Sequence, residues 1–137
     1  MEVLVRESKY YINIYAAELF KAIDDTYMEA IRLWQKSGSI AGFVFYIHSV
    51  IRLEVFASPF IPPRDSDNDE DKKFWAAADD FEEVKKKISL NVFDPNKDLP
   101  IIIQHEKNLR NCLAYAGIVY VGVKRKFDKA SEIVEEI

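Results

Sequence analysis

Apolar side chains recur every three or four residues along most of this chain, which is the spacing of one face of an α-helix. Glycine, proline and clusters of small polar residues interrupt the pattern at intervals. Gly38 stands where a helix C-terminus favours glycine, and Ser39 is placed to cap the helix that follows. The pattern and its interruptions predict four helices, over about 8–37, 40–57, 70–93 and 99–127.

The second predicted helix begins with the most unusual stretch of the chain, Ile40 to Ile51. It contains no formally charged residue, and a helix that is apolar all round is expected to be buried all round. An uncharged run of this length falls short of the roughly 20 apolar residues that span a bilayer. We therefore expect a central helix, no membrane span, and an end at the prolines from Pro59 onward.

A turn and a helix start are expected before the last helix. Asp94, Pro95 and Asn96 are turn residues, and Asp98 with Pro100 resembles the start of a helix. The segment 117–123 has the β-branched composition of a strand, but without a visible partner strand we expect a helix there.

These elements predict an all-α fold. Short connections between long helices favour an antiparallel, up-down-up-down four-helix bundle. Residues 128–137 continue the last helix or form a short fifth one, and residues 1–137 are expected to be a single domain.

The amino-acid composition indicates the general class of protein, but says little about any reaction that it could catalyse. The chain has 137 residues and a formal net charge of −4, which gives no general attraction to nucleic acid or anionic lipid. No secretory signal is visible, so we expect a cytoplasmic protein. The single cysteine, Cys112, excludes an intrachain disulfide and is expected to be a small buried apolar side chain. Abundant Ile, Tyr, Lys and Glu with little Gln are typical of a thermophile.

The acidic loop 65–71 looks at first like a calcium-binding loop, because alternating carboxylates suit a hard cation. The position of the sharp turn is Glu70 instead of glycine, and the closing bidentate position is Ala76. We therefore expect a solvated loop that caps the third helix.

Two basic triplets could contact phosphate groups. Each lies late in its predicted helix, where cations are favoured by the helix dipole in any case, so charge balance within the chain explains them as well. The candidate phosphate contacts are Lys85, Lys86, Lys87, Lys124, Arg125 and Lys126.

The two histidines carry the remaining candidate chemistry. Neither completes the Glu-x-x-His pattern of a di-metal bundle, and a zinc site built from Cys112 and both histidines is not expected. His48 is expected to be a hydrogen-bonded core histidine, and the alternative is a pocket that it lines with Arg52. His105 and Glu106 are expected to form a surface pair. We predict no catalytic residue, metal or cofactor.

Aromatic residues exceed what one face of each helix can bury, and tyrosine and tryptophan are favoured at interfaces. We therefore expect a homo-oligomer, and a dimer in particular. The alternative is that these side chains complete the core.

The region 26–56 has an amphipathic helix that ends in Lys-x-Gly, followed by a helix that bears aromatic residues and a histidine. In this it resembles the paired helices of HEPN-like helical-bundle proteins, including small archaeal members. The resemblance implies a non-catalytic bundle that binds a protein or RNA. The ribonuclease members carry an Arg followed five to seven residues later by His, but no histidine follows Arg110 at that spacing, so nuclease activity does not transfer.

The sequence thus favours a small non-enzymatic interaction or assembly protein that self-associates. The alternative is a nucleic-acid-associated regulator that uses the basic helix ends. An enzyme with a pocket around His48, Arg52 and a tyrosine ranks last.

Overall fold

A computed structural model describes residues 2–118 of the chain, with side chains from residue 14 onward. It contains α1 (Glu2–Ser37), α2 (Ala41–Ala57), a short 3₁₀ helix η1 (Ser58–Phe60), α3 (Asp69–Ser89) and α4 (Pro95–Tyr115). No strand occurs among the described residues, so the all-α prediction is confirmed. The predicted fifth helix and the basic triplet 124–126 lie outside the described residues.

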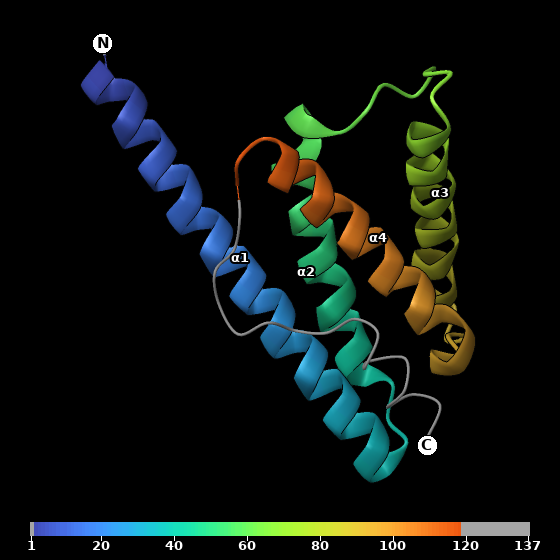
Figure 1. Ribbon diagram of the computed structural model, residues 1–137. Coiled ribbons are helices and arrows are strands. Elements are labelled where there is room, and N and C mark those ends of the chain that lie inside the picture. The colour runs from blue at the N-terminus through green and yellow to red at the C-terminus, as the bar shows by residue number, and fades with distance from the viewer. Residues whose placement is uncertain (1, 119–137) are drawn as a thin grey trace.

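The helices pack pairwise, α1 on α2 and α3 on α4, and α2 packs on α4 to join the two pairs. Figure 1 shows the chain reversing direction at each connection, so that successive helices run antiparallel. The predicted up-down-up-down bundle is confirmed. Because α2 and α4 lie between α1 and α3, they supply most of the residues that bridge the two pairs.

The turn between α1 and α2 follows the sequence prediction closely. Gly38 adopts a left-handed backbone conformation (φ 72°), and its N–H donates to the carbonyl of Trp34 at 2.9 Å. The Ser39 hydroxyl accepts a hydrogen bond from the Ala41 N–H at 3.2 Å. Glycine adopts this conformation more readily than any other residue, which explains why α1 ends here.

The two helices then approach closely at Gly42. A β-carbon at this position would lie 2.7 Å from the α-carbon of Ala30, and both residues are buried. Because Gly42 has no side chain, α1 and α2 can approach each other this closely.

The helix boundaries at the α3–α4 corner differ from the prediction. Helix α3 ends at Ser89 instead of Phe93, because Asn91 takes up a left-handed conformation (φ 59°). Helix α4 begins at Pro95 instead of Leu99, with the Asp94 carboxylate accepting from the Asn96 N–H as its cap. The predicted Asp94–Asn96 turn is thus the first turn of the helix, since proline at the first helical position is already preorganised for it.

Helix α4 also ends earlier than predicted. Gly117 is left-handed (φ 84°), and the Ile118 N–H donates to the Leu113 carbonyl at 2.9 Å, a bond that closes the helix end. The prediction that the helix continues through Gly117 is therefore wrong. Its extension from 119 to 127 lies outside the described residues.

Helix α2 is the central helix of the two-pair arrangement, but it is not buried all round. One side carries core residues such as Phe43, Tyr46 and Leu53, whereas Phe45, His48 and other residues of the opposite side are exposed. The prediction that Ile40 to Ile51 is buried on every side is wrong, because α1 and α4 cover only part of its circumference.

The prediction that no segment has the length of a membrane span is also wrong. The helical stretch Ala41–Phe60 is 20 residues long and apolar enough to cross a membrane by length and composition, and 44% of an 18-residue window within it is buried in the bundle. The core helix of a soluble protein meets the same two criteria.

Candidate functional site

Helix α4 carries two buried ionisable residues, His105 (1% exposed) and Glu106 (0% exposed). They lie between Ile102 and Leu109 on the buried stripe of the helix. The prediction of a surface pair is therefore wrong. A buried ionisable group must be paired and hydrogen-bonded to be tolerated, so the partners of these two residues define the site.

His105 links α4 to α2 and α3. Its Nε2 lies 2.8 Å from Oε2 of Glu54, and its ring stacks on Phe81 with the centroids 4.8 Å apart. Its Nδ1 is buried without a hydrogen-bond partner. These contacts join α4 to α2 and α3 around one buried imidazole.

Glu106 links α4 to α2 and α1. The Tyr46 hydroxyl donates to its Oε1 at 2.7 Å, and Nε of Arg110 lies 2.8 Å from its Oε2. Arg110 in turn donates to Asp24 at 3.1 Å, and its guanidinium lies 4.6 Å from the centroid of the Phe20 ring. We call these contacts among Asp24, Tyr46, Glu106 and Arg110 the Glu106 network. They connect α1, α2 and α4.

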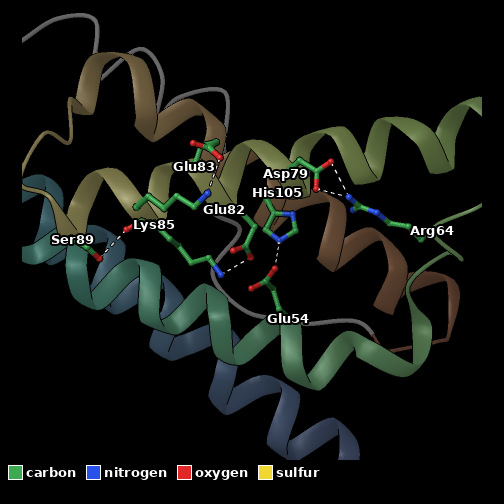
Figure 2. Close-up of polar contacts among 9 residues, drawn as sticks. Glu54, Arg64, Asp79, Glu82, Glu83, Lys85, Ser89 and His105 are labelled. Carbon is green, nitrogen blue, oxygen red and sulfur yellow. Dashed lines mark hydrogen bonds and ion pairs between the residues drawn. The ribbon is translucent and has the colours of Figure 1, made fainter.

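Figure 2 shows the side chains of Glu54, Glu82, Lys85 and His105 converging from α2, α3 and α4. Lys85 forms an ion pair with Glu82 beside the His105–Glu54 contact. In many enzymes, an imidazole oriented by a carboxylate acts as a general base. Here the imidazole is 1% exposed and joins α4 to α2 and α3, so the arrangement holds helices together in this conformation.

The candidate pocket residues lie elsewhere. His48 and Arg52 are both exposed on α2, one helical turn apart. The prediction that His48 is a hydrogen-bonded core histidine is wrong. His48 is exposed, and His105, which was expected at the surface, is buried. Tyr27 and Tyr46 are buried, whereas His48 is exposed.

The candidate phosphate contacts of α3 are engaged with carboxylates of the same chain. Lys85 pairs with Glu82, and Lys86 lies 3.2 Å from Glu83. Lys87 lies 3.0 Å from Asp98. Lys124, Arg125 and Lys126 lie outside the described residues.

Asp98 shows how one of these pairs is built into the fold. Its side chain is 1% exposed, and its Oδ2 accepts from the Asp94 N–H at 2.8 Å while Oδ1 faces Lys87. Asp98 therefore fixes the start of α4 to the end of α3. Its role is structural, although it differs from the helix cap expected from the sequence.

The acidic loop caps α3, as predicted. The Asn68 side chain accepts from the Glu70 and Asp71 N–H groups at 2.8 and 3.3 Å, and the Ser66 hydroxyl donates to Asp71 at 2.7 Å. Across the described residues, no group of three or more His, Cys, Asp or Glu side chains is arranged to hold a metal ion.

Cys112 is half-buried and packs against the core. Burial raises the pKa of its thiol, and the nearby Asp71 carboxylate raises it further. Because the thiolate is the reactive form of cysteine, both effects favour the inert, packed role expected from the sequence.

The second feature of the site region is an exposed stripe along α2, which we call the α2 face. Phe45 (65% exposed) and Val55 (70% exposed) are its most accessible large apolar side chains. The stripe comprises Ala41, Val44, Phe45, His48, Ile51, Arg52 and Val55, of which Ile51 is half-buried. Contiguous exposed apolar residues of this kind mark interaction surfaces.

No protein-family model matches this chain, and no curated protein or solved structure matches it at a significant level. The resemblance of residues 26–56 to HEPN-like bundles therefore stays a prediction.

Proposed function

We propose that this chain is a small interaction or assembly protein that self-associates through the α2 face. The observation that supports this proposal is the exposure of Val44, Phe45 and Val55 along one side of an otherwise buried helix. The aromatic excess expected to form an interface contributes less, because Tyr27 and Phe74 are in the core while Tyr15 is exposed beside the half-buried Phe56.

The size of the α2 face indicates a weak association. Full burial of one Val or Phe side chain contributes about 1.5–3 kcal/mol. Val44, Phe45 and Val55 are 37–70% exposed, so on two copies they bury the equivalent of about three full side chains, roughly 5–9 kcal/mol, against an association cost of about 4–15 kcal/mol. We therefore expect a concentration-dependent dimer with a dissociation constant in the high micromolar range or weaker.

Val55→Asp tests the proposal against a matched control. A carboxylate within an apolar contact should weaken dimerisation at least about tenfold, because the charge loses its water on association. The control is Val92→Asp, since Val92 (61% exposed) lies in the α3–α4 corner, away from the α2 face. Sedimentation velocity from about 5 to 500 μM measures both variants. A wild-type protein that stays monomeric over this range, or equal weakening by both substitutions, contradicts the proposal.

The alternative function, nucleic-acid binding by the basic helix ends, finds less support. Lys85, Lys86 and Lys87 each have a carboxylate partner that phosphate would have to displace. Retention of RNA or DNA that falls steeply with salt would favour this alternative. A catalytic function finds less support still, since His48 and Arg52 are solvent-exposed. A cytoplasmic location remains part of the proposal.

A further inference from the structure

A pocket lies where η1, the first turns of α3 and the last turns of α4 meet. Its volume is about 340 Å³, near the lower end of the range for small-molecule sites. Three aromatic residues from the three helices form much of its apolar wall. Phe60 and Tyr115 are 38% and 94% exposed, whereas Phe74 is buried. The pocket therefore offers aromatic surface that a small ligand can reach.

The charged side chains that line the pocket leave one negative charge without a counter-charge. Glu70 and Lys73 form an ion pair, with 3.6 Å between Oε1 and Nζ. Asp71 is half-buried, and its Oδ2 accepts from the Ser66 hydroxyl at 2.7 Å. No lysine, arginine or histidine in the described part of the chain forms an ion pair with Asp71. The dipole of α3 offsets only about half a unit charge, so the pocket stays negative.

Elsewhere in this protein, an aromatic ring and a carboxylate together hold a cation of the same chain. The Arg64 guanidinium lies 4.6 Å from the centroid of the Trp75 ring and 2.9 Å from Asp79. Two further sets repeat this arrangement: Lys85 with Phe81 and Glu82, and Arg110 with Phe20 and Asp24. The ring face attracts the cation and the carboxylate neutralises it, so the two groups act on the same charge.

The pocket brings together the same two kinds of group. Asp71 and Phe74 are three residues apart, which places them on one side of α3. The Asp71 carboxylate is also near enough to Cys112 of α4 to raise the pKa of its thiol. The carboxylate therefore lies between α3 and α4, beside the aromatic wall.

We propose that this pocket binds a small monocationic amine, with its ammonium group at Asp71 and its apolar stem against Phe60 and Tyr115. The lining residues carry two carboxylates and one ammonium group, so a single positive charge balances them. An anionic ligand would instead be repelled by Asp71. None of the lining residues belongs to the α2 face, so the inference does not depend on self-association.

Two carboxamides of α4 add hydrogen-bonding groups to the site. Asn108 and Asn111 are one helical turn apart, and both line the pocket. The Asn108 carbonyl oxygen accepts from Gln104 at 2.9 Å, whereas the Asn111 side chain forms no hydrogen bond with the described residues. An ammonium group has three donors. Asp71 and the Asn111 carbonyl oxygen are thus acceptors for it from opposite walls.

The test is an NMR titration of the isotope-labelled full chain at pH 7 with phenethylamine, which is cationic at this pH. Phenethyl alcohol is the neutral control of nearly the same shape. We expect saturable shifts at Asn108, Asn111, Cys112 and Tyr115, and binding of the alcohol at least about fivefold weaker than that of the amine. Equal affinity for the two compounds, shifts confined to other surfaces, or no binding of the amine up to about 10 mM overturns the inference.

Asp71→Asn removes the charge but keeps an oxygen that can accept from Ser66. It should weaken binding of phenethylamine at least about fivefold and leave that of the alcohol unchanged. Asp67→Asn is the matched control, because Asp67 is exposed in the same loop and does not line the pocket. Equal weakening by both substitutions means that the amine responds only to the net charge of the loop, and this overturns the inference.

Tyr115→Leu supplies a second variant whose folding is not at risk, since Tyr115 is 94% exposed. Loss of the ring face should weaken binding of phenethylamine about two- to fivefold. Circular dichroism checks that each variant stays folded, and Tyr115→Leu decides if Asp71→Asn does not fold. Unchanged binding of the amine in every folded variant of these two residues overturns the inference.

Discussion

Glu106→Ala should lower the free energy of unfolding by about 3–5 kcal/mol, the cost of breaking a buried ion pair by removing one partner. The substitution leaves the Tyr46 hydroxyl and Nε of Arg110 without the carboxylate that each contacts at 2.7 and 2.8 Å. The net stability of a small domain is about 5–15 kcal/mol, so this is a large fraction of the total. Urea denaturation followed by circular dichroism measures it.

The matched control is Glu29→Ala. Glu29 also pairs with an arginine on its own helix, Arg32 at 2.6 Å, and this hydrogen bond lowers the pKa of the Glu29 carboxyl. Its side chain is exposed, however, and water replaces the lost contact, so little change in stability is expected. Glu106→Gln keeps the volume and an acceptor for Tyr46, and should fall between the two. Equal stability of the Glu106→Ala and Glu29→Ala variants would refute the structural role of the Glu106 network.

Gly42→Val should destabilise the bundle by about 3 kcal/mol, and Gly42→Ala by at least about 1 kcal/mol, because overpacking a buried contact forces the backbone to shift. The sign for alanine is the informative part. In an ordinary helix interior, replacing glycine with alanine gains about 1 kcal/mol. The added β-carbon would lie 2.7 Å from the α-carbon of Ala30, which is backbone and cannot rotate away.

Thermal denaturation of both Gly42 variants measures the effect. Ala76→Val supplies the control, because it adds a branched side chain at an exposed position of α3 and should cost less than about 0.7 kcal/mol. A Gly42→Ala variant that is as stable as the wild type, or more stable, means that α1 and α2 are not in close contact at this point.

The features that local sequence determines were predictable. Gly38 ends α1 in a left-handed conformation that favours glycine, and Asn68 lies in the loop that was expected to cap α3. Helix identity and antiparallel order followed from periodicity and short connections. The end of α4 was misplaced because the apolar run after Gly117 looked like a continuation, although Gly117 itself is a helix-ending residue with φ 84°.

The environments of the histidines were not predicted correctly, because the side of the helix on which each histidine lies was misjudged. Absence of charge around His48 suggested burial, but Arg52 one turn later on the same side of the helix indicates the exposed face. Conversely, His105 and Glu106 lie between the apolar residues Ile102 and Leu109, on the buried stripe of α4. A helical projection of the two segments contains both signals.

The partners in the Glu106 network could not be predicted. Tyr46 and Glu106 are 60 residues apart in the chain, and Arg110 and Asp24 are 86 apart. Their contacts depend on how α1, α2 and α4 are rotated about their axes, which periodicity does not specify. Exposure of the α2 face depends in the same way on which sides of α2 are covered by α1 and α4.

Concentration-dependent NMR spectra of the unmodified chain test self-association through the α2 face most directly. Amide resonances recorded from about 20 μM to 1 mM at pH 8 should shift at Val44, Phe45, His48, Arg52 and Val55. Those of Leu90 and Val92, which are equally exposed apolar residues in the α3–α4 corner, should stay constant. Spectra that do not change with concentration, or shifts confined to other surfaces, would contradict self-association through this face.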